Sequence, residues 1–135
     1  MKTQIATPPD QSKRLLACGV NHESADMSYV SYNGLKDDAL STIPYKRQYM
    51  PNKQPAWSLS ALLELLPKEI MDDNEDSYYL ALAQEFPLSY EYAVSYQPCW
   101  SDGDAIMRER DNCPIEACVK AIEWLTANGY TLNTK

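Results

Sequence analysis

Apolar positions recur at helical spacing near the end of the chain, where two neighbouring stripes between residues 114 and 128 alternate with polar positions. Such a pattern predicts a helix that is covered on two sides. Pro114 suits a first helical turn and Gly129 suits the left-handed residue after a last turn, so both ends are specified. We expect Asp111 or Asn112 to supply the capping oxygen and Glu116 to pair with Lys120. The stripes comprise Ile115, Cys118, Val119, Ile122 and Leu125, and then Ala117, Ala121 and Trp124.

Two further segments have helix starts and stops. Ser58 is placed as the N-cap of a helix over 59–66, with Trp57 stapled to the first turns and Pro67 ending it. Its predicted apolar face comprises Leu59, Leu62, Leu63 and Leu66. Near the start of the chain, Thr7 is the expected N-cap of a short helix that ends at Gly19.

Alternating apolar and polar positions predict strands in the middle of the chain. Residues 88–96 have the period of two that marks a strand with one buried face, and 68–71 and 77–84 flank an acidic turn. These three segments predict an antiparallel meander. The stretch 27–32 also favours a strand, and Asn33-Gly34 after it is a turn dipeptide.

Residues 35–55 have no sustained period, and three prolines break any helix there, although 45–50 could form a short edge strand. The order of elements predicts an α+β fold. We expect a small antiparallel sheet, a meander of three strands plus one or two more, with about three helices packed on one face. The 135 residues fit a single globular domain, 1–135.

Charge and cysteine usage narrow the function classes. A net charge of −7 argues against binding a phosphate backbone or an anionic membrane surface, so neither nucleic acid nor membrane is an expected partner. Four cysteines in a chain of this length lack the density of a secreted disulfide scaffold, and no apolar run resembles a signal peptide. We therefore expect reduced thiols and a cytoplasmic location.

Candidate chemical groups do not form a catalytic set. The acidic turn 72–76 resembles a calcium loop only in part, because Ser77 and Ala83 stand where an EF-hand needs glycine and glutamate. Cys113 lies near a helix start, where thiols can be activated, but His22 is the one histidine available as a base. Cys118 is expected to act as a small core hydrophobe. We predict no catalytic residue, no metal and no cofactor.

The connection over 97–111 is the best candidate for a site, because long loops are often functional. It carries Trp100, Asp102, Asp104 and Arg108. A small-molecule-binding protein or hydrolase with its site at this loop is the alternative function. The structural alternative for the same stretch is a short surface helix over 104–110, with Trp100 covering a sheet edge.

Ten tyrosines against one phenylalanine favour interaction over catalysis, since tyrosine suits half-buried surfaces and interfaces. Tyr90, Tyr92 and Tyr96 are expected in the core, and Tyr45 and Tyr49 are candidate contacts, as are Tyr78 and Tyr79. The favoured hypothesis is a non-enzymatic accessory or protein-interaction domain whose Tyr/Trp-containing surface binds a protein partner or forms a homo-oligomer. An acidic mimic of nucleic acid is a third possibility.

Two segments carry a resemblance to known sequences. PAWSLSALLELLPKEI at 55–70 and NCPIEACVKAIEWLTANGY at 112–130 resemble segments of short uncharacterised proteins from gut-type bacteria and their phages or mobile elements. The resemblance covers about half of the chain. Those proteins have no assigned activity, so the resemblance implies no catalytic residue and supports only the two helix starts derived above.

Overall fold

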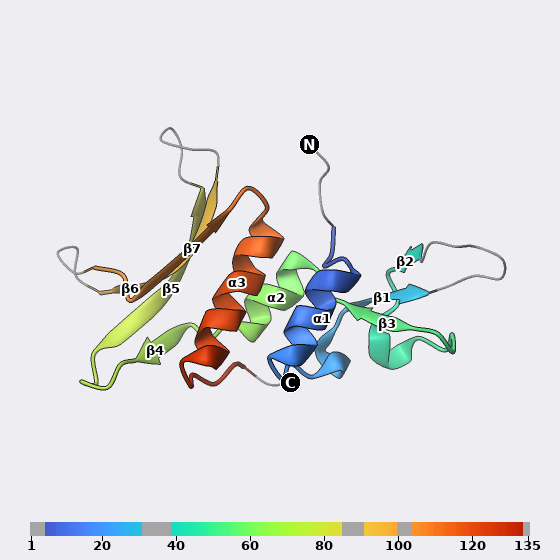
Figure 1. Cartoon of the computed structure of the whole chain (residues 1–135), viewed down its shortest axis with the longest axis horizontal. Helices are drawn as coiled ribbons and strands as arrows, with labels where there is room; N and C mark the ends of the chain where they lie inside the picture. The colour runs from blue at the N-terminus through green and yellow to red at the C-terminus, as the bar shows by residue number, and fades with distance from the viewer. Residues whose placement is uncertain (1–4, 31–38, 85–90, 100–103, 134–135) are drawn as a thin grey trace.

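The computed structural model describes residues 5–30, 39–84, 91–99 and 104–133. It is an α+β fold with strands in two antiparallel sheets, and three α-helices lie between the sheets (Figure 1). The sequence therefore predicts the fold class correctly. The strand expected over 27–32 belongs to a second sheet instead of extending the meander.

The four-stranded sheet contains the meander, in the order β4-β5-β6-β7. All of its neighbouring strands are antiparallel, and Val94 and Tyr96 are buried as the alternation predicts. Ala93 and Ser95, expected on the polar face, are buried as well, and Tyr92 is only partly buried, so the prediction of a single buried face is wrong in the middle of the strand. Its members are β4 (Glu69–Met71), β5 (Ser77–Gln84), β6 (Tyr92–Pro98) and β7 (Met107–Asp111). Predicted strand positions 88 to 90, including Tyr90, lie outside the described residues.

The fourth strand, β7, corrects both readings of 97–111. Residues 107–111 are neither loop nor surface helix, because Met107 pairs with Tyr96 and continues the sheet. Arg108 and Arg110 then alternate with buried Met107 on opposite faces, a period of two that the charged composition hides. Pairing with β6 therefore decides the conformation of 107–111, in place of the local helical propensity.

The smaller sheet has the order β2-β1-β3, formed by β1 (Met27–Val30), β2 (Ala39–Ser41) and β3 (Gln54–Ala56). β2, and β3 apart from its last residue, lie in 35–55, where the sequence indicates no period. The signal is missing because a strand of three residues is too short to show an alternation. The turn at Asn33-Gly34 lies outside the described residues. Trp57, directly after β3, is fully buried and donates its backbone N–H to the Thr7 Oγ1 and its indole N–H to the Ser24 Oγ.

The helices are α1 (Pro9–Ala17), α2 (Leu59–Leu65) and α3 (Pro114–Ala127), with one-turn 3₁₀ helices η1 (His22–Ser24) and η2 (Tyr45–Arg47). Both predicted stripes of α3 face the core, and α3 packs against α1, α2, β6 and β7. Gly129 has φ +82°, and the Tyr130 N–H donates to the Leu125 carbonyl oxygen (2.9 Å), which confirms the predicted helix stop.

The first and second helices follow the sequence with local corrections. Ser58 caps α2 by accepting from the Ala61 N–H, as predicted, but Leu65 is buried where the expected face has partly buried Leu63. Pro8 is the N-cap of α1. Thr7 is not the cap, because its hydroxyl is used by Trp57 and by Ser12.

One ion-pair network joins the first and last helices. Arg14 contacts Glu116 (Nη1 to Oε1, 2.7 Å) and Glu123, and Glu116 also accepts from Gln11. The predicted Glu116–Lys120 pair does not form, because Glu116 faces α1. Lys120 instead donates to the Arg110 carbonyl oxygen (2.9 Å). The network spans two helices and raises the pKa of Arg14, mainly through its hydrogen bond to Glu123.

Candidate functional site

The segment between β2 and β3, which contains η2, is held to the smaller sheet by side-chain hydrogen bonds. Pro44 precedes η2, and the Gln48 side chain is buried beneath it. Its Nε2 donates to the Ser28 Oγ (3.0 Å) and its Oε1 accepts from the Met50 N–H (3.3 Å). The edge strand expected over 45–50 is therefore wrong: the side chain of Gln48, rather than a neighbouring strand, satisfies the local backbone.

Tyr45 is held on two sides of its ring. The Lys53 Nζ lies 4.4 Å from the ring centroid and donates to the carbonyl oxygens of Tyr45 (3.0 Å) and Gln48 (3.1 Å). The His22 ring meets the Tyr45 ring edge-on at 4.9 Å between centroids. Tyr45 also packs partly buried against the hydrophobic core. Tyr45, a predicted contact residue, is therefore partly buried and holds η2 in place through its contacts with Lys53 and His22.

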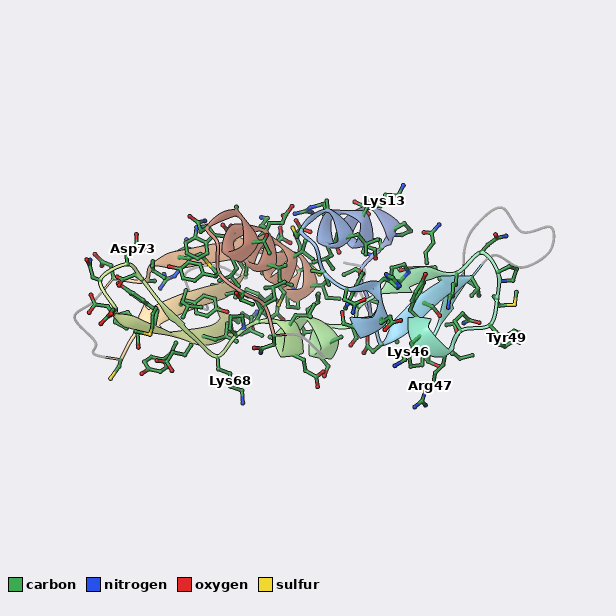
Figure 2. The ribbon with its side chains drawn as sticks, turned by 90° about the horizontal axis from the view of Figure 1, so that it is seen from below. Lys13, Lys46, Arg47, Tyr49, Lys68 and Asp73 are labelled. Carbon is green, nitrogen blue, oxygen red and sulfur yellow. The ribbon has the colours of Figure 1, made fainter. Side chains whose placement is uncertain are left out.

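Four exposed side chains lie around this support. Tyr49 is 82% exposed, the highest value among the exposed large hydrophobic residues, and Ile43 is 38% exposed. Lys46 and Arg47 are exposed on η2, and within the described residues neither forms an ion pair. Figure 2 shows Lys46 and Arg47 pointing away from the body, with Tyr49 at the same end. We call Ile43, Lys46, Arg47 and Tyr49 the basic-aromatic surface.

The electrostatic character of this surface differs from that of the whole chain. The protein has a net charge of −7, yet two free cations and Lys53 lie within eight residues of one another in sequence. Glu23 is the exposed carboxylate of η1, which packs against η2. Among the described residues, the surface therefore has a local excess of positive charge, which suits a carboxylate-bearing ligand.

The remaining predicted site residues lie elsewhere. Asp104 is exposed just before β7, and Arg108 is exposed on β7, in register with Ser95. Trp100 and Asp102 lie outside the described residues. β7 belongs to the four-stranded sheet, whereas η2 contacts the smaller sheet on the other side of the helices, so the structure does not unite Asp104 and Arg108 with Tyr45 and Tyr49 in one site (Figure 1).

Cys118 and His22 have different surroundings. Burial, together with the charge of Cys113, raises the pKa of the Cys118 thiol to about 12, so this group stays protonated in the core. His22 contacts the ring of Tyr45 rather than a cysteine. Within the described ranges no group of three His, Cys, Asp or Glu side chains could hold a metal ion.

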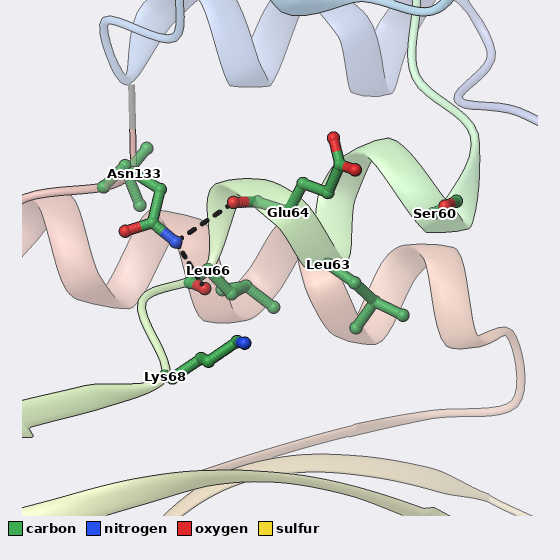
Figure 3. Close-up of a pocket in the computed structure, with 7 residues that line it drawn as sticks. Ser60, Leu63, Glu64, Leu66, Lys68 and Asn133 are labelled. Carbon is green, nitrogen blue, oxygen red and sulfur yellow. Dashed lines mark hydrogen bonds between the residues drawn. The ribbon is translucent and has the colours of Figure 1, made fainter. Parts of the chain in front are cut away.

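The C-terminal segment separates two hollows beside α2. The larger, of about 740 Å³, is wide open and lined by apolar Leu63, Leu66 and Leu132 with polar residues at its rim. Figure 3 shows Lys68 and the carboxylate of Glu64 pointing in different directions, so charged groups do not converge. The smaller, of about 80 Å³, lies against Val20 and Leu65. Neither hollow is lined by a residue of 97–111.

Asn133 lines both hollows and binds the carbonyl oxygens at the end of α2, a role that the sequence does not indicate. Its Nδ2 donates to the carbonyl oxygens of Glu64 and Leu66 (both 3.1 Å), and its backbone N–H donates to that of Leu65 (2.9 Å). Pro67 ends α2, and Asn133 then satisfies the carbonyls left without helical partners. The signal is absent from the sequence because the donor and its acceptors are 67 or more residues apart.

Comparisons with known proteins found no family model, no curated protein and no solved structure that matches the chain. The resemblance of the two helical segments to short bacterial and phage proteins therefore stays a prediction. The described helices include none that is both long and apolar enough to cross a bilayer. The cytoplasmic location likewise stays a prediction.

Proposed function

We propose that this protein is a non-enzymatic interaction domain that binds an acidic segment of a protein partner through the basic-aromatic surface. The observation that carries the proposal is the exposure of Tyr49 beside Lys46 and Arg47, two cations without ion pairs among the described residues. Tyrosine and arginine are enriched at interfaces and supply much of the binding energy there.

The arrangement beneath the surface supports this proposal. Contacts of Tyr45 with Lys53 and His22, and the buried Gln48, fix the backbone that carries the exposed groups. A prearranged surface loses less conformational freedom on binding, which favours affinity. The positive charge of this surface also attracts an acidic partner, whereas the negative charge of the rest of the protein repels it.

The alternative, a small-molecule site at 97–111, has less support. β7 takes up 107–111, and Arg108 and Asp104 are exposed without a hollow at this stretch among the two described above. Nucleic acid is a poorer ligand for the basic-aromatic surface than a carboxylate-rich segment, because the net charge of −7 repels an extended phosphate backbone.

The test compares recovery of partner proteins from host extract by three variants of the chain, quantified by mass spectrometry. Lys46→Glu combined with Arg47→Glu, and separately Tyr49→Ser, should each reduce recovery of the specific partner at least about tenfold, since truncated interface anchors often cost that much. Lys13→Glu is the matched control, because Lys13 is an exposed cation on α1 without an ion pair among the described residues.

Circular dichroism must show that all variants fold alike. The proposal is wrong if every recovered protein responds equally to the Lys13 control and to the surface variants. A partner whose recovery depends on Lys46, Arg47 and Tyr49 alone would support it, and carbodiimide cross-links, which form an amide between the Lys46 amine and a carboxylate of that partner, would locate the bound segment.

A further inference from the structure

The turn between β4 and β5 is negatively charged, opposite in sign to the basic-aromatic surface. Asp73, Glu75 and Asp76 are exposed there, and within the described residues none of the three forms an ion pair. Asp72 instead builds the turn: its Oδ1 accepts from the N–H groups of Asn74 and Asp76, both at 2.9 Å. The three other carboxylates are thus presented outwards on a fixed backbone.

This acidic turn and the basic-aromatic surface lie at opposite ends of the molecule. Figure 2 shows Asp73 at one end of the long axis and Lys46, Arg47 and Tyr49 towards the other. The three α-helices lie between them (Figure 1). The two regions therefore cannot meet within one copy of the chain, but they can meet between two copies.

Each end also has an exposed apolar side chain next to its charges. Met71 directly precedes the acidic turn and is 51% exposed, while Tyr49 is 82% exposed beside Lys46 and Arg47. Thioether sulfur packs favourably against aromatic rings. The two ends therefore have opposite charges, and each has an exposed apolar side chain that can contact the other.

Building on the proposed function, we propose that the acidic segment bound by the basic-aromatic surface is the β4–β5 turn of a second copy of this chain. Lys46 and Arg47 then face Asp73 and Asp76 of the next copy, with Tyr49 against Met71. Because the two contacting surfaces differ and lie at opposite ends, every assembly keeps one free surface of each kind, one at each of its ends. Such head-to-tail contacts generate open chains rather than closed dimers.

The contact is expected to be weak and sensitive to salt. Exposed ion pairs contribute little individually, and salt screens them. The net charge of −7 on each copy adds a repulsion that physiological salt screens beyond about 8 Å. Association should therefore rise with protein concentration and fall at high salt.

The experiment uses two variants of the full chain, each blocked at one end. Lys46→Glu with Arg47→Glu reverses the basic-aromatic surface and leaves the acidic turn intact; Asp73→Lys with Asp76→Lys does the opposite. All four side chains are exposed, and the Asp72 oxygens that build the turn are retained. Sedimentation velocity over a wide concentration range measures the assemblies.

The wild type should form a concentration-dependent series of dimers, trimers and longer chains. Each blocked variant alone should be monomeric, with association at least about tenfold weaker, because like charges then face each other. An equimolar mixture of the two should associate again, because the intact acidic turn of one variant meets the intact basic-aromatic surface of the other, and their reversed ends also carry opposite charges. The Lys13→Glu control should assemble like the wild type.

A wild type that stays monomeric at every concentration would overturn this inference, as would a closed dimer that both blocked variants still form. Failure here is distinguishable from failure of the proposed function. If the blocked mixture stays monomeric while a different protein is still recovered through Lys46, Arg47 and Tyr49, the interaction surface stands and its partner is not a second copy.

Discussion

The Cys118 thiol combines full burial with a pKa raised to about 12, so folding should become less favourable in alkali. An unfolded cysteine ionises near pH 8.5, at about the ordinary value. Between that pH and about 12 the unfolded chain has lost a proton that the folded chain keeps. The unfolded state then binds fewer protons, and the free energy of unfolding falls as pH rises.

We predict that Cys118→Ala flattens this fall by up to about 1.4 kcal/mol per pH unit, the slope for one proton. The substitution also removes a buried sulfur, so a loss of about 1 kcal/mol at neutral pH is expected. Urea unfolding between pH 8 and about pH 10 under reducing conditions measures both effects. Cys99→Ala is the control, because Cys99 is exposed; equal slopes for Cys118→Ala and the wild type would contradict the account.

Among elements, α2 depends most on a residue distant in sequence. The Asn133 side chain donates to two carbonyl oxygens at the end of this seven-residue helix. Asn133→Asp keeps the shape but replaces the donor with a carboxylate oxygen, which faces those carbonyls without a hydrogen to share. We expect the free energy of unfolding to fall by about 1–2 kcal/mol.

Thermal or urea unfolding tests this prediction, with Thr131→Ala as the control in the same segment. Thr131 is exposed and forms no side-chain hydrogen bond within the described part of the chain. The fall should be larger above the carboxylate pKa, where the new group is charged. If Asn133→Asp and Thr131→Ala unfold alike at neutral pH, the cap does not stabilise α2.

At the scale of the whole molecule, the hydrophobic core is unevenly distributed. One cluster of buried side chains joins the three α-helices to the four-stranded sheet, and of the described residues none in β1, β2 or β3 belongs to it. Val30 and Ala56 are buried, but outside this cluster. The smaller sheet should therefore open locally at a lower free energy than the rest.

Native-state hydrogen exchange should show this difference. Amides of β1 are expected to exchange faster than those in the middle of α3, whose protection should approach the global free energy of unfolding. Equal protection of the two elements would mean that the molecule opens as one unit. The result also bears on the basic-aromatic surface, because η2 is attached to the smaller sheet and a bound partner should slow exchange in β1.

The sequence by itself determined the elements whose signals are local. The two stripes, Pro114 and Gly129 define α3, because helical faces and caps depend on residues within a few positions of one another. Ser58 and Pro67 define α2 in the same way, and the alternation at 92–96 identifies β6. From these elements the α+β class follows.

Tertiary structure decided what depends on residues far apart. β7 is a strand because β6 lies beside it, and two sheets form where one was expected. Asn133 caps α2 across 67 or more positions, and Gln48 orders η2 through Ser28. The sequence identified Tyr49 as a candidate contact from composition and places Lys46 and Arg47 close before it, but only the fold shows that all three are exposed and that neither described cation forms an ion pair, since exposure is set when distant segments pack together.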